Sequence, residues 1–345
     1  MLVYSIRRLL AAIPVLLAAS IFVFLLVDLS GDPVAELIFL AEATGEPLSP
    51  EAIEEVKARL YHDRSMGERY LLWLAGIGQD RGDIGLLRGQ FGPSVRGTAV
   101  DIGDQISNRV LTTLRLVGLA TILGIVLGII TGVLSAIRQY SKTDHAITFV
   151  GFLALAMPVF WFGAIIKQGG IWVNDILEPI MGDRPIGTIG SQSAVREGFT
   201  TWDTVMDIAG HLILPTLTLA LLGYAVFSRF QRASMLEVLN SDYVRLARAK
   251  GLRNRTVMRK HALRTALIPV LTLVTIGVIT AVDGAVLTET VFQWNGMGRF
   301  FVDSLQRTDT FAVMGFLMLS GTLVVIANLI ADLLYAVLDP RIRYD

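Results

Sequence analysis

Few side chains in this sequence could do covalent or metal chemistry. The chain has no cysteine, which excludes disulfides, thiolate metal ligands and cysteine nucleophiles. The four histidines are far apart and form no HExxH pattern, so no metal site is predicted: they are His62, His145, His211 and His261. None of the five lysines follows a glycine, so the GxxxxGKS/T loop that holds ATP phosphates is absent. The sequence therefore predicts no catalytic residue, no metal and no cofactor bound by this chain.

The strongest concentration of charge is basic. The segment SDYVRLARAKGLRNRTVMRKH, residues 241–261, has Asp242 as its single acidic residue. Its seven cations are Arg245, Arg248, Lys250, Arg253, Arg255, Arg259 and Lys260. The segment lies between two of the most apolar stretches of the chain. What the cations can bind therefore depends on where the elements on either side place them.

Those elements predict an all-α membrane protein with six transmembrane helices. Hydrophobic residues make up 53% of the 345 residues and charged residues only 17%, whereas about a quarter of a soluble domain is charged. Six stretches approach the roughly 20 apolar residues that a span needs. They are residues 9–27, 116–136, 147–166, 212–230, 267–287 and 311–338. The third is the weakest, because Lys167 follows it closely.

The distribution of cations predicts the orientation of these spans. They gather before the first span, after the second, after the fourth and after the sixth, at Arg7, Arg8, Arg138, Lys142, the 241–261 segment, Arg341 and Arg343. With six spans all four regions fall on one side, which the positive-inside rule makes cytoplasmic. At about 2.5–3.5 kcal/mol each, seven cations at mid-bilayer would cost on the order of 20 kcal/mol. We therefore expect a multi-pass protein of the cell membrane, with both termini and the basic segment in the cytoplasm.

The chain accordingly divides into four regions. Residues 1–28 form an N-terminal anchor span, and residues 29–108 form a small extracytoplasmic segment that includes a short helix with Ser49 as its cap and Pro50 at its first position. Residues 109–338 hold five spans and a cytoplasmic loop at 236–266, and residues 339–345 form a cytoplasmic tail.

The second span carries small residues at every fourth position from Ala120 to Ala136, which predicts close packing against another helix in this chain or in another subunit.

Within the loop, the pattern predicts two short helices joined at a glycine. Asn240, Ser241 and Asp242 are good N-cap residues, and Gly251 supplies a left-handed stop. Asn254 can cap a second helix that continues to Pro269. Val244, Ala247 and Gly251 share one face, and a small-residue face bordered by cations suits docking into a groove on another protein. The alternative is a solvated loop that only sets topology.

Polar residues inside the last two spans are candidates for lining a pathway. They are Thr272, Thr275, Asp283, Asn328 and Asp332. Ionisable residues within a membrane are functional hypotheses, so one alternative function is a proton-coupled secondary transporter. The other interpretation is that these side chains form hydrogen bonds between helices or back to their own helix. A membrane-embedded enzyme is disfavoured, because the sequence shows no reactive constellation.

Several of these segments resemble one known family. DYVRLARAKGL at 242–252 and HALRTALIPVLT at 261–272 are similar to the cytoplasmic loop of the membrane subunits of bacterial binding-protein-dependent ABC importers, in the dipeptide/oligopeptide/nickel branch. GDP at 31–33, GDIG at 82–85, AMPVFWFG at 156–163, HLILPTLTLAL at 211–221, TETVFQWNGMGRFFVDSLQRTD at 288–309 and LLYAVLDPRIRY at 333–344 extend the resemblance over nearly the whole chain. The general loop motif begins Glu-Ala-Ala, and Arg245-Leu246-Ala247 stands in its place here. Residues 178–206 match the family poorly.

The resemblance implies a type I importer permease fold and a B-type permease subunit of a dipeptide or oligopeptide importer. It implies a homologous second permease subunit as a heterodimer partner, one or two ABC ATPase subunits that hold ATP and Mg²⁺, an extracytoplasmic peptide-binding protein and a surrounding bilayer, with no nucleic acid. The ATPase contacts would be Asp242, Tyr243, Val244, Arg245, Ala247, Arg248, Lys250, Gly251 and Leu252. Whether the solute is a dipeptide, a longer peptide, a nickel chelate or haem stays open.

Overall fold

The computed structural model describes residues 2–78, 82–193 and 200–338, except for the side chains of 2–3, 271–272, 275–284, 331–332 and 334–338. Within these residues the chain forms two compact units. Unit 1 contains 2–111 and 296–329, and unit 2 contains 112–295 and 330–338. The boundary between the units falls inside two long helices, α5 (Ile102–Ile137) and α14 (Thr310–Leu338).

Long apolar helices dominate both units. In the described part of the chain, four segments are long and apolar enough to cross a membrane: Tyr4–Ala43, Ile102–Ile137, Thr201–Leu239 and Thr310–Ile330. They correspond to α1 (Leu2–Ser30) with α2 (Pro33–Ala43), to α5, to α8 (Thr201–Leu239) and to α14. These agree with the first, second, fourth and sixth predicted spans.

The third predicted span, residues 147–166, is not one straight helix. α6 (Lys142–Ala156) and α7 (Val159–Met181) meet at a bend of 114°. Met157 leaves the helical region with φ −90° and ψ 132°, and Pro158 follows it. A proline ring disfavours helical backbone in the residue before it, so the break falls where this rule places it. The prediction of a single span at 147–166 was therefore wrong in its geometry.

The predicted extracytoplasmic segment, residues 29–108, lies within unit 1. It contains α2, α3 (Pro50–Arg59), α4 (Met66–Ala75) and a small antiparallel hairpin of β1 (Ile84–Gly85) and β2 (Gln90–Phe91) around the short 3₁₀ turn η1 (Leu86–Arg88). The hairpin departs from the all-α prediction. Ser49 caps α3 as predicted, with its hydroxyl oxygen accepting from the Ala52 amide at 3.2 Å.

The core of unit 1 joins this segment to the last helices of the chain. Trp73 and Ile84 are buried in one cluster with Phe300 of α13 (Met297–Gln306) and Phe311 of α14. The carboxylate of Asp309, at the start of α14, accepts hydrogen bonds from the Ser94 hydroxyl at 2.5 Å and from the Val95 amide at 3.3 Å. The segment is thus packed onto the C-terminal helices, and a second apolar cluster within it contains Val34, Leu60 and Val95.

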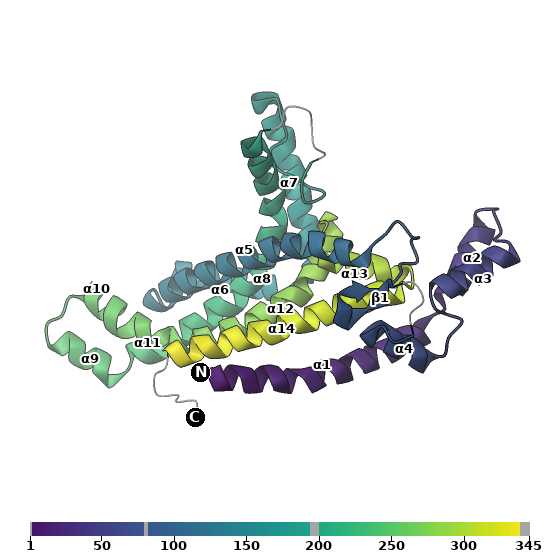
Figure 1. Cartoon of the computed structure of the whole chain (residues 1–345). Helices are drawn as coiled ribbons and strands as arrows, with labels where there is room; N and C mark the ends of the chain where they lie inside the picture. The colour runs from purple at the N-terminus through teal and green to yellow at the C-terminus, as the bar shows by residue number, and fades with distance from the viewer. Residues whose placement is uncertain (1, 79–81, 194–199, 339–345) are drawn as a thin grey trace. The chain divides into compact units, whose positions relative to one another are not determined.

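In unit 2, the remaining helices pack around α8. The small-residue stripe of α5 lies against it: a Cβ added at Gly124 would lie 2.9 Å from the Ala220 carbonyl oxygen, and one at Gly128 would lie 2.5 Å from the Phe227 Cβ. The packing interpretation of this stripe is confirmed, with a partner helix in the same chain. α6, α7 and α12 (Ile268–Phe292) also contact α8. Figure 1 shows the short helices α9 and α10 at one extremity of unit 2, well away from α7.

Candidate functional site

The candidate site is the basic loop (residues 242–252), which follows α8. Its first helix is α9 (Asp242–Ala249), which begins after Ser241 in the extended conformation of an N-cap. The Ser241 hydroxyl donates to the Val238 carbonyl at 2.5 Å and makes no capping hydrogen bond to α9. The first short helix therefore forms as predicted, but the expected cap contributes its backbone conformation only.

Gly251 ends the first helical segment as predicted. Its φ is +75°, in the left-handed region, and its amide donates to the Arg248 carbonyl at 3.0 Å. A Cβ added there would meet no atom within 4 Å, so the requirement for glycine is one of backbone conformation and not of space. This bend returns the chain toward α9.

The return segment is helical but irregular. It contains α10 (Asn254–Thr256), a π-helical stretch η2 (Val257–Leu263) and α11 (Arg264–Ala266), and α12 starts at Ile268. Asn254 is already the first helical residue, and Arg253 has the N-cap position, so the predicted Asn254 cap was wrong. π-Helical turns are rare and are frequently found at functional sites.

The face that we expected to dock on another protein is turned inward. Val244 is 0% exposed and Ala247 is 6% exposed. Both pack in one apolar cluster with Met235 of α8, Ala136 of α5, and Val257, Ala262 and Ala266 of the return segment. Small residues here let the two short helices approach each other closely. The small-residue docking face was therefore a wrong prediction, because intramolecular packing uses it.

The outer face of the basic loop carries large and charged side chains. Tyr243, Leu246 and Leu252 are exposed, and Leu246 reaches 57%. All seven cations of the 241–261 segment are exposed as well. Arg245 lies 3.6 Å from Asp242, but both are solvent-exposed, and such a pair holds little energy. The exposed surface thus combines three apolar side chains with a strong positive charge, as expected for a protein-docking surface.

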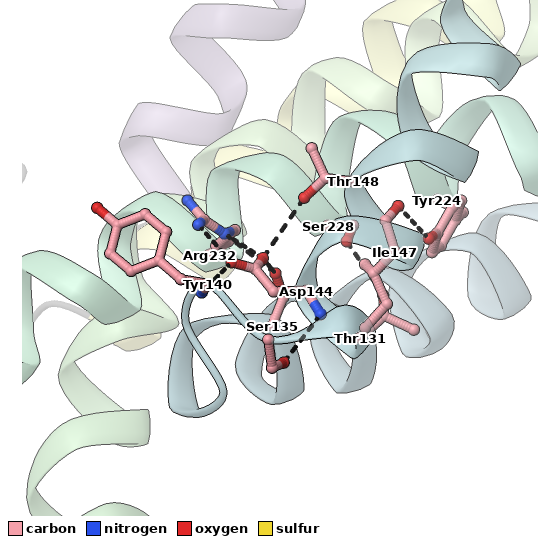
Figure 2. Close-up of polar contacts among 10 residues, drawn as sticks. Thr131, Ser135, Tyr140, Asp144, Ile147, Thr148, Tyr224, Ser228 and Arg232 are labelled. Atoms are coloured by element: carbon pink, nitrogen blue, oxygen red, sulfur yellow. Dashed lines mark hydrogen bonds and ion pairs between the residues drawn. The ribbon is translucent and has the colours of Figure 1, made fainter.

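An ion pair with a buried carboxylate connects the neighbouring helices, and the sequence interpretation missed it. Arg232 of α8 binds Asp144 of α6 through two hydrogen bonds of 2.9 Å, one to each carboxylate oxygen. The Ser135 hydroxyl of α5 also donates to Asp144, and the Tyr140 amide donates to Asp144 Oδ2 at 2.9 Å (Figure 2). Asp144 is 2% exposed, so its charge depends on these partners. The Ser141-Lys-Thr-Asp144 pattern signals a helix start, but nothing local points to Arg232, 88 residues away.

The pathway candidates are only partly described. The side chains of Thr272, Thr275, Asp283 and Asp332 lie outside the described residues. Asn328 is half-buried in α14. Among the residues that the structure does describe, no group of three or more His, Cys, Asp or Glu side chains could hold a metal ion.

Comparisons with known proteins agree on one family. Residues 124–344 match the family described as binding-protein-dependent transport system inner membrane component, and residues 1–117 match its N-terminal counterpart. The oligopeptide transport system permease protein AppB of Bacillus subtilis is 37% identical, with all of both chains covered. OppB of Mycobacterium tuberculosis is 37% identical over 99% of this chain and 98% of its own. The dipeptide transport system permease protein DppB of Escherichia coli is 35% identical over 100% of this chain and 99% of its own.

A solved structure shows the same fold. A chain of the inward-facing methionine ABC transporter MetNI superposes with a TM-score of 0.51 at 17% identity, covering 68% of this chain and 96% of that chain. This similarity supports the expected type I importer permease fold. Together with the family matches over both parts of the sequence, it places the chain among the non-catalytic permease subunits of ABC transporters: this protein belongs to the inner membrane components of binding-protein-dependent transport systems.

Proposed function

We propose that this chain forms, with a homologous second permease subunit, the translocation path of an ATP-driven importer of dipeptides or oligopeptides. The observation that carries this proposal is the end-to-end similarity, at 35–37% identity, to permeases whose names specify oligopeptide or dipeptide transport. One or two ATPase subunits bind and hydrolyse ATP with Mg²⁺, and an extracytoplasmic binding protein delivers the peptide. Nickel chelates and haem are the other solutes that transport assays should include.

Six spans remain our proposal for the topology. The four apolar helices, the bent α6–α7 pair and α12 would make six. At 1.5 Å per residue, the 25 residues of α12 span about 37 Å, enough to cross the hydrocarbon core. Both termini and the basic loop then lie in the cytoplasm, with residues 29–108 outside.

We further propose that the basic loop docks on an ATPase subunit through its outer face. The exposed Tyr243, Leu246 and Leu252 supply apolar contacts, and the surrounding cations supply charge complementarity. Val244 and Ala247 act indirectly: by packing against the return segment, they hold α9 rigidly on the end of α8. ATP-driven movement of the ATPase would thereby reach α8 and α12.

The test combines Arg245→Glu and Arg248→Glu in the assembled transporter. We expect the double variant to insert normally but to lose the ATPase during purification, because its docking surface now repels the partner. Lys57→Glu, an exposed charge reversal on α3, is the matched control and should keep the ATPase. If the double variant co-purifies with a full complement of ATPase, the docking assignment is wrong.

A further inference from the structure

The turn between α5 and α6 (residues 137–142) presents an unusual surface. Ile137 and Tyr140 are exposed, Tyr140 at 77%, and Arg138 and Lys142 on either side are exposed cations. Tyr140 adopts φ +63°. A left-handed backbone is rare for a bulky residue and persists only where the surrounding structure enforces it. The surrounding structure must therefore hold the backbone of Tyr140 in this conformation, in which its side chain is exposed.

The buried Asp144 network enforces the conformation. The Tyr140 amide donates to Asp144 Oδ2, the oxygen that also accepts from Arg232 Nη2 (Figure 2). Asp144 Oδ1 accepts from Arg232 Nε and from the Ser135 hydroxyl. One carboxylate thus joins the end of α5, the turn, the start of α6 and α8. The arrangement fixes the turn to α8.

The end of α5 that leads into the turn packs in the same apolar cluster as the basic loop. Ala136, the residue before the turn, belongs to the apolar cluster that contains Met235, Val244, Ala247 and Val257. α8 carries both Arg232 and Met235, and it leads directly into α9. The turn and the basic loop are therefore both anchored to the end of α8, one through Arg232 and Ala136 and the other through the apolar cluster.

We propose that the α5–α6 turn is a second contact surface for the ATPase subunit that docks on the basic loop. This inference rests on the proposed function. Tyr140 and Ile137 are its apolar anchors, and Arg138 and Lys142 add positive charge that acidic residues on the partner would complement. Asp144 and Arg232 are positioning residues that act through Tyr140. The competing occupant is the anionic lipid surface, since tyrosines and cations also gather where helices leave the membrane.

The experiment measures the affinity of the ATPase subunits for the permease pair in nanodiscs of neutral and of anionic lipid. Tyr140→Ala should weaken binding about tenfold in both lipids, as the loss of an interface anchor does. Phe149→Ala, which removes another exposed aromatic from α6, is the matched control and should bind like the unmodified protein. If Tyr140→Ala binds within about twofold of the unmodified protein, or if its defect appears only in anionic lipid, the second contact does not exist.

A double-mutant cycle tests the positioning role. Asp144→Asn should weaken ATPase binding about as much as Tyr140→Ala, and the combined variant should be no worse than either single variant, because both act through one surface. A purely structural Asp144 would instead add its own loss to that of Tyr140→Ala, and this outcome overturns the positioning role.

The two proposals fail in different ways. If Arg245→Glu with Arg248→Glu and the turn variants all keep the ATPase, the docking function itself fails. If only the turn variants keep it, the basic loop remains the docking site and the second contact fails.

Discussion

At the scale of single residues, one backbone angle at Gly251 sets the shape of the proposed docking surface. Its φ of +75° sets the direction of the return segment, and nothing within 4 Å would obstruct a side chain. Gly251→Ala should therefore cost only about 1 kcal/mol, whereas Gly251→Pro removes the amide donor and forces φ to about −65°. We expect the alanine variant to bind the ATPase a few-fold more weakly and the proline variant not to bind it.

The control for this prediction is Gly45→Ala. Gly45 has a similar φ of +80° and equally open surroundings, but it lies in the predicted extracytoplasmic segment. It should lose stability to a similar extent without losing ATPase, as co-purification at fixed permease would show. A proline variant at 251 that retains its partner would contradict the role of the bend.

His62 of unit 1 predicts a pH dependence. Burial is the main cause that holds the pKa of His62 below its usual 6.5. The Arg69 guanidinium, 2.9 Å from Nε2, lowers this pKa further, and the carboxylates of Asp32, Asp28 and Asp63 oppose the shift. The folded protein then binds fewer protons than the unfolded chain, so stability is fully present above about pH 6.5 and is lost as pH falls toward the lowered pKa.

Thermal unfolding checks this directly. The midpoint temperature of unfolding should decrease as the pH is lowered from 7.5 to 5.5. In His62→Gln this decrease should be smaller, because glutamine does not titrate. An equally steep fall in the variant would mean that other groups govern the acid sensitivity.

At the scale of elements, the contact of α5 with α8 depends on the absence of side chains. Gly128→Ala would place a Cβ 2.5 Å from that of Phe227, so the helices must separate, at a cost of about 1–3 kcal/mol. Gly118→Ala in the same helix meets nothing within 4 Å and should be neutral or slightly stabilising. Unfolding midpoints of the two purified variants test this, and equal midpoints would show that the stripe does not set the helix distance.

Local rules predicted the elements well and their long-range partners poorly. Apolar length located α1, α5, α8 and α14, and the Ser49 cap and the Gly251 stop are both local signals. The predicted docking face of α9 was wrong, because small residues favour close packing without specifying whether the partner lies in the same chain or in another protein. A proline at position 158 signals a helix break by itself, but the size of the bend, 114°, depends on how α7 packs on α8 and α12.

The Asp144–Arg232 pair marks the limit of such reasoning. Each residue, taken alone, resembles one more charge near the end of a span. Only the fold brings the two side chains within 2.9 Å, and only then is the burial of Asp144 apparent.

At the scale of the whole molecule, the proposed import function predicts the source of energy for transport. Uptake of a labelled peptide by the assembled transporter should require ATP and the binding protein, and it should survive collapse of the proton gradient. Asp332→Asn should leave uptake intact, because no proton carrier is needed. Uptake that continues without ATP and stops when the proton gradient is collapsed would support the proton-coupled alternative.

The docking of the basic loop on an ATPase subunit is the central claim, and the absence of native cysteine allows it to be tested by site-specific cross-linking. Leu246→Cys places a thiol on the outer face of α9, where the side chain is 57% exposed, and Val244→Cys places one two residues away on the buried face. A short bifunctional reagent should join Leu246→Cys to the ATPase subunit and leave Val244→Cys unlinked. If Leu246→Cys forms no such link and is instead labelled by an impermeant reagent from outside sealed cells, the loop faces the wrong side of the membrane and the account is contradicted.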